Sequence, residues 1–283
     1  MADHEAHDVT YAEFDPPPAL RAYVRCLWRL RSSTTLSVAP PPEPILPDGC
    51  VELVLHLGEP FSRYDACRRA ERQPRQLLAG QITSAIVVQP STTMNVWGIR
   101  FHPWSAGSFL GMPSVELRDR VVPLDELSRR LARALDPLVE QASDAAQLEY
   151  LVAVLSSHVS SIMPPHDRLN RVIAHVTTSS VDHTVRTLAK EIGLGARRVD
   201  ALFREHVGLS PKQLLRIHRF QRALALRRAM PTLSWASIAL RVGYYDQAHF
   251  VRDARSISGS APNELLRNAG GLTEIFLSSD AMP

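Results

Sequence analysis

The strongest constraint on the fold is a pattern that occurs twice between residues 185 and 267. The copies are VRTLAKEIGLGARRVDALFREHVGLSPKQLL and WASIALRVGYYDQAHFVRDARSISGSAPNELL. Each contains Ala-x-x-x-Gly, then a second helical segment, then Gly-x-Ser-Pro or Gly-x-Ala-Pro. Ala189 and Ala239 are small enough for two helices to cross closely, and Gly193 and Gly243 favour the left-handed conformation that ends a helix. The repeat predicts two helix-turn-helix units, since two unrelated hairpins would rarely share all these positions.

One long helix is expected between the two units. Apolar side chains recur with helical spacing along PKQLLRIHRFQRALALRRA, which predicts a helix from Pro211 to Ala229. The apolar positions are Leu214, Leu215, Ile217, Phe220, Ala223, Leu224 and Leu226.

The two units and the joining helix resemble the C-terminal DNA-binding domain of the AraC/XylS family of transcriptional regulators. The similar residues of the joining helix and second unit are Arg219, Arg222, Ala223, Leu224, Leu226, Ser234, Ile238, Ala239, Val242, Gly243, Tyr244, Phe250 and Pro262. The chain departs from the family at Ala254, where an aromatic residue is usual, so looser packing is expected there. The resemblance implies a transcription factor that binds double-stranded DNA and acts on RNA polymerase recruitment.

The resemblance also implies which side chains contact DNA. The recognition helices would span Ala196 to Val207 and Gln247 to Arg255, and would lie roughly 34 Å apart in successive major grooves. Arginine pairs with guanine, aspartate accepts from cytosine, glutamine suits adenine, and small apolar groups touch the thymine methyl. Residues expected on the groove faces are Arg197, Arg198, Asp200, Ala201, Arg204, Gln247, Ala248, Val251 and Arg252. Residues expected at phosphates are Lys212, Arg216 and His249.

The charge distribution favours the same interpretation. Residues 166–268 hold 17 Lys and Arg against 8 Asp and Glu, whereas the remainder holds 15 basic against 21 acidic residues. A basic segment beside an acidic one is expected when only the former must meet phosphates.

Other features bear on location and cofactors. The sequence has no run of 18 apolar residues, so no membrane-spanning helix is expected. Its polar, acidic N-terminus does not resemble a signal peptide. Cys26, Cys50 and Cys67 are odd in number and form no Cys-x-x-Cys pair, which argues against a disulfide framework or structural zinc. We therefore predict a cytoplasmic protein with no cofactor.

The N-terminal half is predicted to be mainly antiparallel β structure and barrel-like. A Pro-Asp-Gly turn at residues 47–49 leads into a strand from Cys50 to Leu57, in which apolar residues alternate. Residues 19–30 fit either a helix or a strand, and residues 61–74 resemble a loop. Further strands are predicted at 76–79, 85–89 and 94–101.

Helices are predicted after Ser105, notably at 124–135 and 137–161. The second carries an apolar stripe, which could form a homodimer surface or pack on its own β unit. Prolines 164 and 165 mark a boundary. The expected α+β chain therefore has a flexible leader (1–15), a sensor and dimerisation domain (16–162), a linker (163–167), an all-α double helix-turn-helix domain (168–268) and a tail (269–283).

A second resemblance concerns the N-terminal half. The segments PDGCVEL, GIRFHPWSAGSFLG and VPLDEL are similar to a domain often found ahead of this DNA-binding half, which implies a sensor for a small-molecule effector. Candidate ligand-binding residues are Glu52, His56, Arg100, His102 and Trp104. Two histidines with a carboxylate could also bind a metal, although these residues equally fit structural roles.

Three hypotheses follow. The first is an effector-controlled transcriptional regulator that is not an enzyme. The second is a cupin-like metal-dependent enzyme fused to the same DNA-binding module, with the metal held by His56 and His102. The third is a constitutive architectural DNA binder whose N-terminal half only dimerises.

Overall fold

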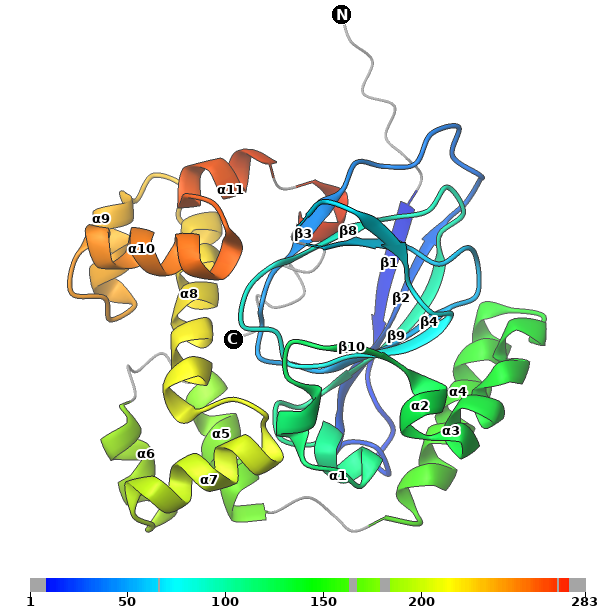
Figure 1. Ribbon diagram of the computed structural model, residues 1–283, viewed down its shortest axis with the longest axis horizontal. Helices are drawn as coiled ribbons and strands as arrows, with labels where there is room; N and C mark the ends of the chain where they lie inside the picture. The colour runs from blue at the N-terminus through cyan, green and yellow to red at the C-terminus, as the bar shows by residue number, and fades with distance from the viewer. Residues whose placement is uncertain (1–8, 66, 163–166, 179–183, 269, 275–283) are drawn as a thin grey trace, which may run out of the picture.

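The computed structural model describes residues 9–65, 67–162, 167–178, 184–268 and 270–274 (Figure 1). A β-rich N-terminal half with short helices lies beside an all-helical C-terminal half. This is the predicted α+β arrangement. Most of the predicted linker lies outside the described residues.

The strands form two antiparallel sheets. Their bounds are β1 (Val9–Phe14), β2 (Val24–Ser32), β3 (Glu43–Ile45), β4 (Glu52–His56), β5 (Ser62–Tyr64), β6 (Ala70–Arg72), β7 (Gln76–Ala79), β8 (Ile86–Gln89), β9 (Asn95–Phe101) and β10 (Val121–Pro123). The six-stranded sheet has the order β1-β2-β9-β4-β7-β10, and the four-stranded sheet β3-β8-β5-β6. The β unit is mainly antiparallel, as expected, and its barrel-like form consists of two separate sheets within the described part of the chain.

Several strands confirm the predictions and others correct them. Strands β4, β7, β8 and β9 fall where strands were expected, and β2 resolves the ambiguity at residues 19–30. The prediction of a flexible leader was wrong for residues 9–14, because β1 pairs with β2 from Val9↔Ser32 to Phe14↔Leu27. The prediction of a loop at residues 61–74 was also wrong, since this segment contains β5 and β6. These two strands have three residues each, too few to show alternation.

The six-stranded sheet has two different faces, because neighbouring residues of a strand point to opposite sides. One face packs against helices and belongs to the largest hydrophobic core. Its central residues include Leu27, Leu53, Leu55, Trp97 and Ile99. The other face is turned toward the four-stranded sheet and carries Trp28, Leu30, Val54 and Val96. The space between the two sheets thus forms a second interior.

Helices cover the first face. They are α1 (Ala106–Leu110), η1 (Ser114–Leu117), α2 (Leu124–Leu127), α3 (Arg129–Leu135), η2 (Asp136–Glu140) and α4 (Asp144–Val159). The single helix predicted at 137–161 is divided, because Ser143 caps the start of α4 by accepting a hydrogen bond from the Ala146 N–H. Leu151 and Leu155 are fully buried against the sheet. The apolar stripe therefore packs on its own β unit, and these residues are unavailable to a dimer partner.

The C-terminal half contains both predicted helix-turn-helix units. Its helices are α5 (Asp167–Thr178), α6 (Val185–Ile192), α7 (Ala196–His206), α8 (Pro211–Ala229), α9 (Trp235–Arg241), α10 (Gln247–Ser258) and α11 (Pro262–Asn268). The first unit is α6–α7, the second is α9–α10, and α8 is the joining helix with the predicted bounds. Gly193 and Gly243 have φ of +70° and +89°, as predicted. None of the described helices is long and apolar enough to cross a membrane.

The two units contact the N-terminal half through their cores. Trp104 belongs to the core of the first unit and Leu46 to the core of the second. The Ser114 hydroxyl donates to the His206 carbonyl at 2.8 Å, and the Ala85 N–H donates to the Ile257 carbonyl at 2.7 Å. The β unit therefore touches both units, at the C-terminal end of each second helix.

Candidate DNA interface and ligand cavity

The predicted DNA-contacting side chains lie mainly on the free faces of α7 and α10. In α7, Val199, Leu202 and Phe203 face the core, which leaves the opposite side exposed. The exposed members of the predicted set are Arg197, Arg198, Ala201, Arg204, Lys212, Gln247, Ala248 and Arg252. Asp200, Arg216, His249 and Val251 are partly buried.

Three of the predicted residues, Asp200, Arg204 and Arg216, are paired within the protein. The Asp200 carboxylate accepts a hydrogen bond from Arg204 Nε at 2.7 Å, one turn further along α7. Arg216 Nε of α8 donates to Asp253 of α10 at 2.9 Å. Arg216 thus links the joining helix to the second unit, whereas Lys212 of the same helix is exposed.

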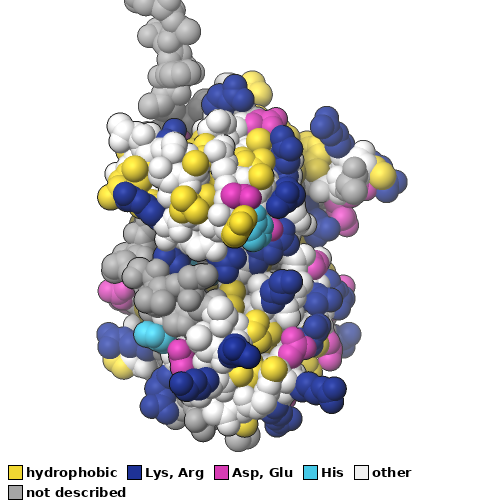
Figure 2. Space-filling model, turned by 90° about the vertical axis from the view of Figure 1, so that its left-hand side faces the viewer, with side chains coloured by type: hydrophobic (Ala, Val, Ile, Leu, Met, Phe, Trp, Pro, Cys, Tyr) yellow, Lys and Arg dark blue, Asp and Glu magenta, His cyan; other side chains and the backbone are white. Residues whose placement is uncertain are grey.

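Basic side chains are spread over the face formed by the C-terminal half. Figure 2 shows Lys and Arg over both its upper and lower parts, interspersed with fewer acidic groups. Asp246 caps the N-terminus of α10 at this surface, since its carboxylate accepts a hydrogen bond from the His249 N–H at 2.6 Å. Such a surface matches phosphate-rich DNA.

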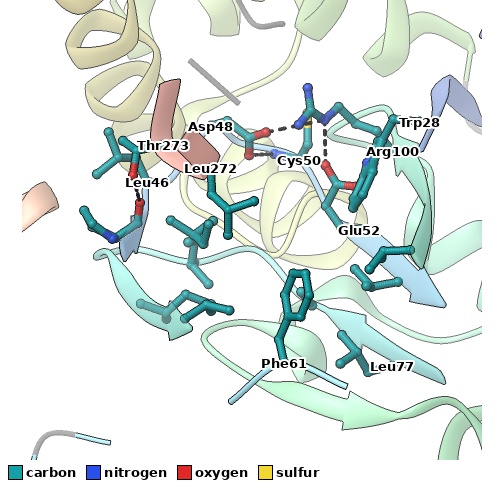
Figure 3. A pocket seen from close by; sticks show the side chains of 18 of the residues that line it. Trp28, Leu46, Asp48, Cys50, Glu52, Phe61, Leu77, Arg100, Leu272 and Thr273 are labelled. Carbon is teal, nitrogen blue, oxygen red and sulfur yellow. Dashed lines mark hydrogen bonds and ion pairs between the residues drawn. The ribbon is translucent and has the colours of Figure 1, made fainter. Parts of the chain in front are cut away.

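A second feature is a cavity of about 120 Å³ between the two sheets (Figure 3). Most of its wall is apolar and comes from both sheets, including Leu30, Val54, Phe61, Leu77, Val88 and Val96. The remaining wall comes from the C-terminal half: Gln221 of α8, with Leu272 and Thr273 beyond α11. The cavity is therefore bounded by both halves of the molecule.

Charged groups gather at one end of the cavity. Glu52 uses both carboxylate oxygens: Oε1 accepts from Arg100 Nε at 2.6 Å, and Oε2 accepts from Trp28 Nε1 at 2.7 Å. Burial raises the pKa of Glu52 above its ordinary value. Asp48 Oδ1 accepts from the Cys50 N–H at 2.8 Å, whereas Asp48 Oδ2 lies 3.8 Å from Arg100 Nε. Only 2% of the Arg100 side chain is exposed.

The C-terminal segment closes another part of the cavity. The Thr273 N–H donates to Glu43 Oε2 at 3.0 Å, and its hydroxyl donates to the Pro44 carbonyl at 2.8 Å. Leu272 is buried among core residues of the β unit. Part of the predicted tail therefore docks on β3, while Ile275, Phe276 and Leu277 lie outside the described residues.

The five candidate ligand residues do not form one site. Glu52 and Arg100 line the cavity. His56 lies beside it, with Nε2 at 3.2 Å from Gln73 Oε1 and its ring against Phe61, and burial lowers its pKa to about 4. His102 and Trp104 stack on each other outside the cavity, with ring centroids 4.7 Å apart. Of these five residues, only Glu52 and Arg100 therefore line the cavity, and their role in ligand binding stays a prediction.

The strand register also separates the two histidines proposed to hold a metal. His56 is paired with Val96, and His102 lies six positions further along the chain. Six residues of extended strand span about 20 Å. His56 and His102 therefore cannot bind one ion together, which removes the basis of the metal-enzyme hypothesis.

Three groups at the cavity were missed from sequence. Asp48 belongs to the Pro-Asp-Gly turn, which was interpreted only as a lead into the strand. Gln221 is a polar residue of the joining helix, and its Nε2 donates to the Pro47 carbonyl at 2.6 Å. Thr273 is more than 200 residues from its partners Glu43 and Pro44 in the chain, so no local pattern could have indicated this contact.

Comparisons with known proteins assign both halves to families. Residues 188–268 match a family described as a helix-turn-helix domain, and residues 12–123 match a domain of unknown function, DUF6597. No curated protein matches the chain.

Similar solved structures include ToxT from Vibrio cholerae, with 10% identity, a TM-score of 0.44 and coverage of 93% of this chain and 100% of that one. ToxT bound to an unsaturated fatty acid is 12% identical, with a TM-score of 0.41 and coverage of 81% of this chain and 90% of that one. The AraC-like transcriptional activator CuxR is 14% identical, with a TM-score of 0.28 and coverage of 82% of this chain and 89% of that one.

These TM-scores are all below 0.5, so the assignment depends on the C-terminal half itself. That half matches the helix-turn-helix family over 81 residues, from 188 to 268. It also has two helix-turn-helix units joined by one long helix, with the glycines in the predicted conformation. Residues 188–268 therefore form a helix-turn-helix domain with the architecture of an AraC-type DNA-binding domain.

Proposed function

We propose that this regulator binds two successive major grooves with α7 and α10, and that a small molecule in the cavity controls its binding to DNA. Base edges would be contacted by Arg197, Asp200 and Ala201 from α7, and by Gln247, Ala248, Val251 and Arg252 from α10. Phosphates would be contacted by Lys212 and His249, flanked by Arg198 and Arg204. The observation that carries the effector role is the shared wall of the cavity, which includes Gln221 of α8.

The turn at residues 47–49 provides a physical link between cavity and DNA-binding half. The Pro47 carbonyl accepts from Gln221, and Asp48 lines the cavity. Gly49 has φ of +84°, and a Cβ there would lie 2.9 Å from Leu214 Cδ1 of α8. Because α8 joins both units, a ligand that shifts this turn would change the relative free energies of two arrangements of the DNA-binding half.

Two further partners belong to the proposal. The AraC-type architecture of the helix-turn-helix domain supports action on RNA polymerase at a promoter. A homodimer through α4 would have to use its exposed side, since Leu151 and Leu155 are buried. Arg216 is a weaker candidate for a phosphate contact than Lys212, because its guanidinium is paired with Asp253.

The experiment is selection of bound duplexes from a random DNA library with the full chain, at two salt concentrations. Phosphate-driven binding falls steeply with salt, whereas base contacts preserve sequence preference. We expect enrichment of two short blocks about one helical turn apart. Binding without any enriched sequence, lost entirely at the higher salt, would contradict specific regulation.

A further inference from the structure

We propose that the cavity binds a small apolar amine, and that Asp48 accepts a hydrogen bond from its ammonium group. This inference rests on the proposed effector role of the cavity and names the chemical class of its ligand. It uses the size of the cavity, the charge balance at its polar end and the position of Asp48.

The size and walls of the cavity limit the body of the ligand. Its volume of about 120 Å³ is close to the roughly 150 Å³ of an engineered apolar cavity that binds benzene. Phe61, Leu77 and Val88 present apolar surface from three different strands or loops. A single ring with a short chain therefore fits this space better than a long or highly polar molecule.

The charges at the polar end do not balance. Arg100 and Glu52 neutralise each other, and both Glu52 oxygens already accept hydrogen bonds. Asp48 adds a second negative charge, although only 16% of its side chain is exposed. At 3.8 Å, Asp48 Oδ2 is beyond hydrogen-bond distance of Arg100 Nε. Arg100 forms ion pairs with both Glu52 and Asp48, so the three charged groups that line the cavity have a formal charge of −1 in a largely apolar surrounding, where an unbalanced charge is costly.

An ammonium group is the ligand head that best corrects this imbalance. It carries the opposite charge and three N–H donors, and charge-assisted hydrogen bonds are stronger than neutral ones. The Trp28 ring lines the same cavity, and aromatic faces attract cations. A carboxylate head would place a third negative charge beside Asp48 and Glu52, so an organic acid of the same shape is disfavoured.

The position of Asp48 connects this ligand to the DNA-binding half. Its two chain neighbours are Pro47, which accepts from Gln221, and Gly49, which lies against Leu214. An ammonium held by Asp48 therefore lies next to the contact between the β unit and α8.

The test is isothermal titration of the full chain with three probes: 2-phenylethylamine, 2-phenylethanol and 3-phenylpropanoate. We expect the amine to bind at least about tenfold more tightly than the alcohol, which corresponds to about 1.4 kcal/mol, and the acid to bind most weakly. Asp48→Asn keeps an oxygen for the Cys50 N–H and should reduce the amine preference to less than about threefold. Glu71→Gln makes the same charge change at an exposed residue of β6 and should leave the preference unchanged.

Three results would overturn the proposal: no preference for amine over alcohol in the native chain, tightest binding of the acid, or no binding of any probe at millimolar concentration. An amine preference that persists in Asp48→Asn would overturn the role of Asp48. The probe series on the native chain remains decisive if Asp48→Asn fails to fold. Specific DNA binding is measured in the absence of probes, so its loss contradicts the proposed function and leaves the ligand class to be tested separately.

Discussion

The two helix-turn-helix units share one sequence pattern but have different interiors. The core of the first unit is mostly aliphatic around Phe203 and includes Trp104 from the β unit. In the second unit, Trp235 and Tyr244 pack on Phe250 with ring centroids 5.0 and 5.3 Å apart. Aromatic packing there comes from positions other than Ala254, where the resembled family usually has an aromatic residue. The shared pattern therefore specifies how two helices cross, and leaves the chemistry of each core free to differ.

The exposed faces of the two recognition helices differ as well. Three exposed arginines lie on α7, namely Arg197, Arg198 and Arg204, and two lie on α10, namely Arg252 and Arg255. At its start, α10 presents Gln247 and Ala248 instead of arginines. Arginine suits guanine and phosphate, while glutamine and alanine suit adenine and the thymine methyl. We therefore expect the first unit to contribute more of the charge-dependent affinity, and the second to prefer A·T pairs.

The largest expected effect tests the difference between the two cores. Phe250→Ala should lower the free energy of unfolding by about 3–5 kcal/mol, the usual loss for a buried Phe. It should exceed the loss from Phe203→Ala, because each lost ring pair adds about 0.5–1.5 kcal/mol. Urea unfolding of the full-length variants measures both. Equal losses would show that ring geometry contributes nothing beyond burial in the second unit.

The units themselves were the most predictable part of the fold. Their signals are local: Gly193 and Gly243 end helices, and Ser210 with Gln213 forms a capping box at the start of α8. The joining helix has its predicted bounds because its apolar spacing extends over five turns.

The cavity was less predictable, because distant segments form it. Alternation in β4 correctly placed Glu52 on the inner face. His102 was wrongly included, since β9 ends at Phe101 and the residues after it turn toward the first unit. The docking of Thr273 on Glu43 depends on how the two halves pack, which no pattern within either segment encodes.

The next effect tests whether the two recognition helices prefer different bases. Arg197→Ala and Gln247→Ala should each cost about 1–3 kcal/mol at one base-pair position, and those positions should lie in different blocks of the selected site. Competition binding with duplexes that carry single base changes measures this. If Arg197→Ala weakened binding to every duplex equally, Arg197 would be a phosphate contact and the difference between the units would be smaller.

A smaller effect separates two cations of the joining helix. Lys212→Ala should reduce the slope of log affinity against log salt by about 1, the loss of one phosphate contact. Arg216→Ala should leave that slope nearly unchanged and lower the free energy of unfolding by about 1 kcal/mol, because it breaks a partly exposed pair with Asp253. Salt titrations and urea unfolding of both variants are needed. A reduced slope in Arg216→Ala would show that DNA displaces Asp253.

The smallest expected effect concerns Asp200, which has two competing uses. Its pair with Arg204 is largely exposed and spans one helical turn, so Asp200→Asn should lower the free energy of unfolding by only about 0.3–0.5 kcal/mol. The effect on DNA is more informative. If Asp200 accepts from cytosine, the variant loses preference at one base pair. If Asp200 serves only to hold Arg204, the variant frees that guanidinium for phosphate, and affinity rises for all sequences alike. In that second case α7 would recognise bases through Arg197 without Asp200, and the first unit would be still more dependent on charge than the second.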